Sequence, residues 1–173
     1  MNIVLFKKSK EAEELCKELG LVNNYFLEDV LLAEGRDKKK LLQEINLGKN
    51  QGKLVIYKVN DEETLRFVLE KTNVDVVIGA EGTHEKDSLH YVRAGLDDVL
   101  CKIAADRGKT IGFSFSSVLN SSVRGKLLAR MMLNVRLCKK YKIKTMLSNF
   151  SNSVEEMRSS KDLDAWGRVL GLQ

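Results

Sequence analysis

The sequence of 173 residues contains no proline, two histidines and three cysteines. Without proline, a strong marker of loops is missing, so element boundaries must be inferred from glycines and capping residues. No apolar run approaches the roughly 20 residues that a membrane-spanning helix needs, and the apolar N-terminus meets Lys7 and Lys8 at once. We therefore expect a cytoplasmic protein with no signal peptide and no membrane partner.

The scarce cysteines and histidines limit the available chemistry. The cysteines fall at separate apolar helical positions, which predicts buried thiols in a reducing compartment. Both histidines, His84 and His90, lie with three carboxylates in the single loop Glu81–His90. A hydrolytic metal site collects ligands from several strand ends, so we expect no metal bound by this chain. The serines of the run 113–117 have no accompanying His/Asp pair, and we expect no catalytic residue.

Alternating strand and helix patterns predict one α/β domain over residues 1–173. Strands are expected over residues 2–6, 26–33, 53–58, 74–79, 110–115 and 144–148, with the alternating run 113–117 belonging to a strand. Helices are expected after Ser9, from about Asp37 to Gly48 or Gly52, after Asp61, around 97–104, over 122–141 and over 161–170. Repeated βα units imply parallel strands with right-handed crossovers. The pattern alone permits either an open doubly wound sheet or a closed barrel.

Basic charge is concentrated in one part of the chain. Between Lys102 and Lys144 there are eleven Lys and Arg residues and one acidic residue, Asp106, and residues 107–154 contain no Asp or Glu. Solvated helix faces usually interleave Glu with Lys. The block, which includes Arg107 and Arg130, therefore predicts a surface for a polyanion.

The helix expected over residues 122–141 divides into two faces at 100° per residue. The apolar arc holds Val123, Leu127, Leu128, Met131, Val135 and Cys138. The opposite arc holds Lys126, Arg130, Arg136 and Lys140, with Lys139 at the border. We expect the helix to pack by its apolar arc and to present unpaired cations to solvent, where bound phosphates would release counterions.

Several motifs follow one another in the C-terminal part of the chain: GLDDVLCKIAA at 95–105, IGFSF at 111–115, RGKLL at 124–128, NVRLCKKY at 134–141, SN at 148–149, MRS at 157–159 and GRVLG at 167–171. In this order they resemble the TIM-barrel-like protein subunit of archaeal and eukaryotic ribonuclease P. The resemblance covers roughly residues 74–172, and residues 1–73 share only the βα rhythm. Ser160 stands where that family usually has proline, and Met132 and Leu133 replace a commonly basic pair, which removes charge from the long helix.

The resemblance implies a compact TIM-barrel-like fold related to polymerase-and-histidinol-phosphatase (PHP) barrels, without their metal site. It implies a subunit that binds the ribonuclease P RNA, pairs with a small RRM-like protein subunit and supports removal of the 5′ leader from precursor tRNA, which it contacts indirectly. The Mg²⁺ of that reaction would serve the RNA, and this chain would bind no cofactor. With the charge pattern, it predicts these RNA-binding residues: Arg93, Lys102, Arg107, Arg124, Lys126, Arg130, Arg136, Lys139, Lys140 and Arg158.

Two other functions remain open from the sequence. A metal-dependent phosphoesterase of the PHP-like barrel type would use the loop from His84 to His90. A barrel scaffold with no RNA partner would bind RNA only weakly and without regard to its sequence.

Overall fold

The computed structural model describes residues 1–172. The elements follow in the order β1 (Asn2–Ile3), α1 (Lys10–Glu18), β2 (Asn24–Tyr25), β3 (Val30–Ala33), α2 (Lys38–Asn50), β4 (Leu54–Lys58), α3 (Glu62–Lys71), β5 (Val76–Ile78), the 3-10 helix η1 (Ala80–Gly82), α4 (Asp98–Asp106), β6 (Thr110–Ser114), α5 (Phe115–Leu119), α6 (Arg124–Lys140), β7 (Lys144–Ser148), the 3-10 helix η2 (Val154–Glu156) and α7 (Ser160–Leu170). None of these helices combines the length and hydrophobicity that a membrane crossing requires.

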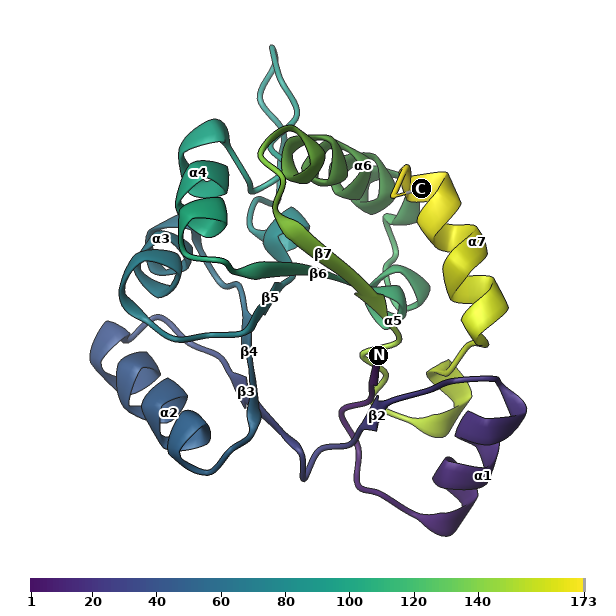
Figure 1. Cartoon of the computed structure of the whole chain (residues 1–173). Coiled ribbons are helices and arrows are strands. Elements are labelled where there is room, and N and C mark those ends of the chain that lie inside the picture. Colours follow the sequence, from purple (N-terminus) through teal and green to yellow (C-terminus); the bar gives the residue numbers. More distant parts are fainter. Residues whose placement is uncertain (173) are drawn as a thin grey trace.

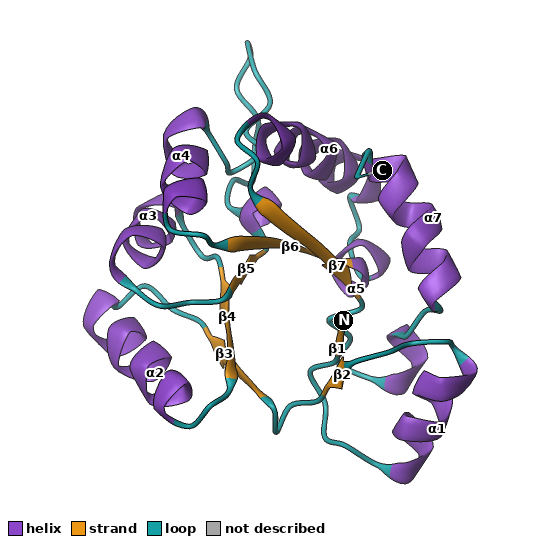
Figure 2. Ribbon diagram, in the orientation of Figure 1, coloured by secondary structure: helices purple, strands orange, loops and turns teal. Residues whose placement is uncertain are grey.

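The strands form a barrel with helices around its outside (Figures 1 and 2). Five parallel strands pair in the order β3-β4-β5-β6-β7, and β1 pairs in parallel with β2. The segment after β7 joins the two ladders, because Phe150 N–H donates to Ile3 O at 2.8 Å and Leu5 N–H donates to Ser151 O at 2.7 Å. The TIM-barrel-like fold is therefore confirmed. The predicted relation to PHP barrels stays a prediction.

Several predicted boundaries differ from the structure. The strand expected over 2–6 ends at Ile3, and three other differences have a local reason. The strand expected over 26–33 is interrupted before β3, because Phe26 N–H donates to the Asp29 carboxylate at 3.0 Å and the chain turns there. The run 113–117 leaves the strand at Ser114, whose hydroxyl caps α5 by accepting from Ser117 N–H at 3.2 Å. Gly48 lies inside α2, where a Cβ atom would meet side chains of Leu31 and Val55 at 3.0–3.1 Å; glycine there lets the helix approach the sheet.

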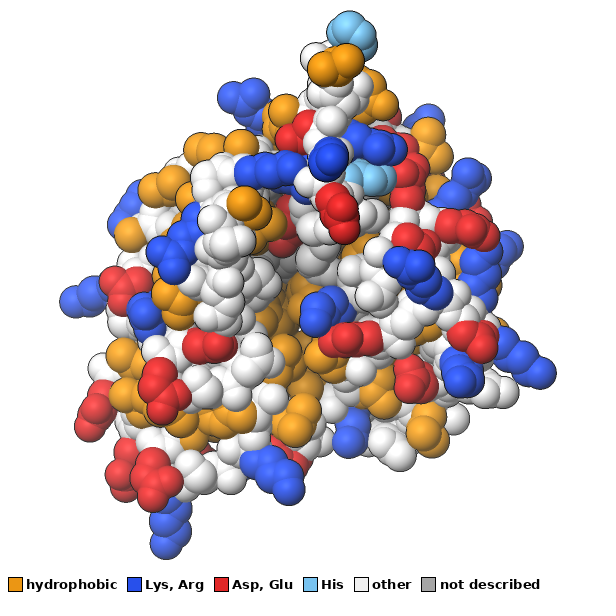
Figure 3. Space-filling model, turned by 180° about the vertical axis from the view of Figure 1, so that it is seen from behind, with side chains coloured by type: hydrophobic (Ala, Val, Ile, Leu, Met, Phe, Trp, Pro, Cys, Tyr) orange, Lys and Arg blue, Asp and Glu red, His pale blue; other side chains and the backbone are white. Residues whose placement is uncertain are grey.

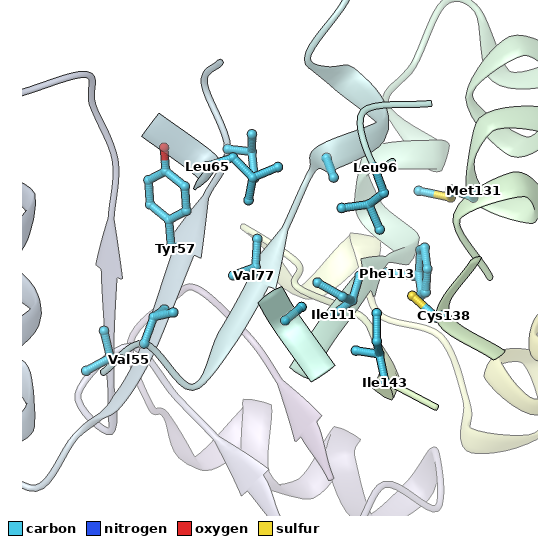
Figure 4. Packing of buried hydrophobic residues seen from close by; sticks show 14 of the residues in the cluster. Val55, Tyr57, Leu65, Val77, Leu96, Ile111, Phe113, Met131, Cys138 and Ile143 are labelled. Carbon is cyan, nitrogen blue, oxygen red and sulfur yellow. The ribbon is translucent and has the colours of Figure 1, made fainter. Parts of the chain in front are cut away.

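Two apolar clusters fill the barrel and its outer layer. The interior holds Ile3, Val30, Ile56, Val76, Ile78 and Phe150. Gly112 of β6 makes room for them, because a Cβ atom there would lie 2.8 Å from a methyl of Ile78 and 2.9 Å from one of Val76. Alternate residues of the same strands point outward and pack under the helices (Figure 4), as the two-residue period of a strand requires. The three cysteines are buried free thiols, as predicted.

A buried polar network closes the barrel where β1 meets β7. The Ser148 hydroxyl binds Ile3 N–H at 2.6 Å, and the Asn149 side chain donates to Asn2 Oδ1 at 3.0 Å. The Asn149 side chain also accepts from Arg158 N–H at 2.8 Å. The SN and MRS motifs therefore have a structural role, since they join the N-terminal strand to the segment that leads into α7.

Candidate nucleic-acid interface

The link between β5 and α4 organises one side of the molecule. Instead of a short turn, the chain forms η1 and then an irregular segment, residues 83–97, part of which contacts α6. Lys126 Nζ donates to Glu85 O at 2.5 Å, and Asn134 Nδ2 donates to Ala94 O at 2.8 Å. Lys126, Arg130 and Asn134 are spaced four residues apart and therefore lie on one face of α6. This row of polar side chains holds the segment.

Arg130 is the buried centre of this row. Its side chain is 4% exposed, and its guanidinium donates to Glu81 O, to His84 O and twice to Asp87 Oδ1, at 2.5–3.1 Å. The prediction that Arg130 faces solvent was wrong, because a segment from about 45 residues earlier covers that face of α6. Four of its five N–H groups are thus bound within the chain.

Carboxylates of the same region neutralise other cations of the basic block. Asp87 lies 3.9 Å from Lys126 Nζ, and hydrogen bonds from Arg130 lower the pKa of Asp87. Asp98 accepts from Lys140 Nζ and from the Tyr141 hydroxyl at 2.8 Å each, and these bonds lower the pKa of Asp98 and raise that of Lys140. The expectation that the helix cations are unpaired was therefore wrong for Lys126, Arg130 and Lys140.

Three further predicted residues lie apart from one another. Arg124 is exposed at the start of α6 and donates to Leu119 O at 2.7 Å. Arg158 is half-buried, donates to the carbonyls of Glu155 and Met157, and lies 5.8 Å from the centre of the Phe115 ring. Arg93 is exposed in the segment beside α6. The ten predicted residues thus do not form one continuous surface.

Exposed cations lie along α4 and around the C-terminal end of α6, and we call them the basic edge: Lys102, Arg107, Arg136, Lys139, Lys142 and Lys144. Sheet pairing brings Arg107 and Lys144 to the same end of the barrel, because Lys144 at the start of β7 is in register with Thr110 at the start of β6. Within residues 1–172 none of the six makes an ion pair, in contrast to Lys126, Arg130 and Lys140.

Lys142 and Lys144 were not among the predicted RNA-binding residues. They follow α6 in sequence, so helix periodicity gives no reason to group them with Arg107. Arg107 and Lys144 line a common hollow of about 630 Å³ at this end of the barrel. Its one acidic residue, Asp75, is bound to Lys49 and to Val55 N–H.

Lys109 belongs to the same region but has an internal role. Its buried ammonium donates to Thr72 O at 2.6 Å and to Val74 O at 3.2 Å, so it caps the C-terminus of α3. Burial lowers the pKa of Lys109. A cation at a helix C-terminus is also favoured by the helix dipole.

The histidine loop does not gather metal ligands. His84 Nε2 lies 3.7 Å from Glu62 Oε2, and burial and the neighbouring Arg93 lower the pKa of His84. His90 is exposed near the outer end of the loop. Residues 1–172 contain no group of three or more His, Cys, Asp or Glu side chains arranged to hold a metal ion. The phosphoesterase alternative therefore has no ligand set in this part of the chain.

Sequence comparison identifies relatives along nearly the whole chain. No protein-family model matches it. Ribonuclease P protein component 3 of Thermococcus kodakarensis is 24% identical over 184 residues, covering 96% of this chain and 83% of the relative. The protein of the same name from Methanosarcina mazei is 31% identical over 114 residues, covering 65% of this chain and 44% of the relative. These homologues support the assignment of the chain to the ribonuclease P protein component 3 family.

The solved structures agree with this component 3 assignment at the level of the fold. A chain in the cryo-EM structure of archaeal ribonuclease P with mature tRNA superposes with a TM-score of 0.74 at 19% identity, covering 98% of this chain and 74% of that chain. The similarity includes residues 1–73, where the sequence pattern showed only alternating strands and helices.

Proposed function

We propose that this component 3 protein is a subunit of ribonuclease P that binds the catalytic RNA and supports removal of the 5′ leader from precursor tRNA. The carrying observation is the basic edge, in a chain whose relatives bear the component 3 name. Exposed cations without carboxylate partners gain most from phosphate contacts, because each contact releases condensed counterions. Such contacts position RNA and do not read its sequence.

The proposal assigns the predicted residues different roles. Lys102, Arg107, Arg136 and Lys139 would contact phosphates from the basic edge, joined by Lys142 and Lys144. Arg93, Arg124 and Arg158 stay predicted contacts outside that edge. Arg130 would act indirectly, by holding residues 81–94 in place. The Mg²⁺ of the reaction would be held by the RNA, and the protein partner would be a small RRM-like subunit.

Reconstitution tests the function. Ribonuclease P RNA and the other protein subunits are assayed for cleavage of precursor tRNA with and without this chain, at limiting Mg²⁺. We expect the chain to increase the cleavage rate. No stimulation would contradict the proposed role, and metal-dependent cleavage of a phosphodiester by the chain alone would favour the phosphoesterase alternative.

Charge variants test the assigned surface. Arg107→Ala with Lys139→Ala removes two cations from the basic edge, and Lys39→Ala with Lys40→Ala removes two exposed cations from α2, on the other side of the barrel (Figure 1). We expect the first pair to lower the salt dependence of RNA binding by about 0.7–0.9 in slope per lost contact. The control pair should leave it unchanged, and equal effects of the two pairs would show non-specific attraction by net charge.

A further inference from the structure

Residues 87–93 form a closed loop that projects beyond the ring of helices, which we call the apolar loop (Figure 1). Asp87 holds both of its ends, because its carboxylate binds the Arg130 guanidinium at 2.7 Å and accepts from Arg93 N–H at 3.0 Å. Ser88 N–H donates to Tyr91 O at 3.0 Å and closes the tip. The loop is therefore anchored at its base by the buried Arg130 of α6, and its tip projects into solvent.

The apolar loop exposes side chains that water solvates poorly. Leu89 is 99% exposed, Tyr91 63% and Val92 45%. At this exposure Leu89 packs against no neighbouring apolar surface among residues 1–172. Three large apolar side chains exposed within four residues are typical of a contact site for another macromolecule. The space-filling view shows the hydrophobic and histidine side chains at the outermost point of the molecule (Figure 3).

A hollow at the base of the loop continues this surface toward α3 and α4. It has a volume of about 320 Å³, and its lining includes Tyr91 and Val92 of the loop, the carboxylates of Glu62 and Asp97, and Arg93. A second hollow shares Glu62 and Asp97 and extends to Glu63 and to Val99, which is 53% exposed. The apolar loop, these carboxylates and Val99 thus form one continuous surface.

The charge of this surface distinguishes between classes of partner. Both hollows are lined by the carboxylates of Glu62 and Asp97. Glu63 is bound to Lys38 and Arg66 to Glu70, which leaves Arg93 as the cation of these linings without an ion-pair partner among residues 1–172. Carboxylates beside exposed apolar side chains repel RNA phosphates and attract the Lys and Arg side chains of a protein. Apolar side chains at the centre with charged ones at the rim are also the usual arrangement of a protein interface.

We propose that the apolar loop and the acidic hollow at its base dock a basic segment of a protein partner. The inference rests on the proposed function, because it places the contact with the second protein subunit on this surface and leaves the basic edge for RNA. An apolar side chain of the partner would fill the hollow next to Tyr91 and Val92. Basic side chains of the partner would pair with Glu62 and Asp97.

The test measures binding of the small RRM-like ribonuclease P subunit from the same organism by titration calorimetry. Tyr91→Ser with Val92→Ser should weaken binding at least about tenfold. Glu62→Gln should weaken it less and reduce its salt dependence. Val22→Ser and Val169→Ser, at residues 67% and 59% exposed elsewhere on the molecule, serve as matched controls and should leave affinity unchanged. Circular dichroism verifies that each variant is folded.

The outcomes separate this inference from the proposed function. If the wild-type chain does not bind the subunit, the proposed partnership fails and this inference fails with it. If the wild-type chain binds and the loop variants bind equally well, only the docking surface is wrong. Loss of RNA affinity in the loop variants, with subunit binding intact, would show that the loop contacts RNA. Self-association of the wild-type chain that the variants abolish would identify a second copy as the occupant.

Discussion

The substitution Arg130→Met removes the buried guanidinium and keeps a long apolar side chain on α6. Four hydrogen bonds disappear, two to the carbonyls of Glu81 and His84 and two to Asp87. Met fills most of the vacated volume, so the loss of the polar contacts dominates the effect. The prediction tests whether Arg130 holds residues 81–94 against the barrel.

The carbonyls of Glu81 and His84 determine how much stability the substitution Arg130→Met costs. A buried carbonyl left without a donor costs about 1–3 kcal/mol. The bond to Glu81 O is buried, and the bond to His84 O is part-buried, so water replaces some of the second bond. Asp87 adds little to this loss, because it is exposed and water can solvate it. The expected loss in the free energy of unfolding is about 2–4 kcal/mol, a large fraction of the roughly 5–15 kcal/mol that stabilises a typical domain.

Urea denaturation followed by circular dichroism measures this loss, with Arg136→Met as the control. Arg136 is exposed on the same helix and makes no ion pair within residues 1–172, so its replacement should change stability by less than about 0.5 kcal/mol. At a temperature where both variants are folded, RNA affinity should fall more for Arg136→Met than for Arg130→Met. Equal stability of the two variants, with equal losses of RNA affinity, would refute the anchoring role of Arg130.

Three further predictions concern the barrel and its buried groups. Gly112→Ala should destabilise the protein by about 1–3 kcal/mol, since the new methyl group would lie 2.8–2.9 Å from Ile78 and Val76. Gly125→Ala in α6 has open space around it and should leave stability unchanged or raise it. Equal effects of the two substitutions in urea denaturation would contradict the close fit at Gly112. Burial raises the pKa of Glu81 to about 7, so the folded state holds a proton that the unfolded state releases near pH 4.5. The free energy of unfolding should therefore fall by about 3 kcal/mol as the pH rises from 4.5 to 7. Glu81→Gln should abolish this slope, and a flat profile of the wild-type protein would contradict the prediction. Burial raises the pKa of Cys101 and Cys138 to about 12, so both thiols should resist iodoacetamide at pH 8 until urea unfolds the chain, and rapid labelling of the native protein would count against the buried positions.

Helix starts were predictable because their signals are local. Ser9, Asp37 and Asp61 cap their helices by accepting hydrogen bonds from backbone N–H groups two or three residues later. Such bonds depend on a few consecutive residues and can be inferred without the fold. The same local chemistry was underestimated at Ser114, where a capping serine ends β6 and begins α5.

The charge pattern was a less reliable guide to the site. A run without acidic residues indicates unpaired cations only if no carboxylate approaches from elsewhere in the chain. Asp87 and Asp98 approach α6 from residues that precede it by about 40 positions, and they neutralise Arg130 and Lys140. Conversely, sheet register brings Arg107 near Lys144, a grouping that no helical period contains.

The sequence by itself determined the alternation of strands and helices, the capped helix starts, the buried cysteines and, through its ordered motifs, the family. These properties depend on neighbouring residues or on motifs that can be compared directly. Only the tertiary structure decided which cations are free, that Arg130 is a buried anchor, and that Leu89, Tyr91 and Val92 project from a closed loop. The physical reason is that exposure and charge compensation depend on which distant segments meet, and the packing of the barrel determines those meetings.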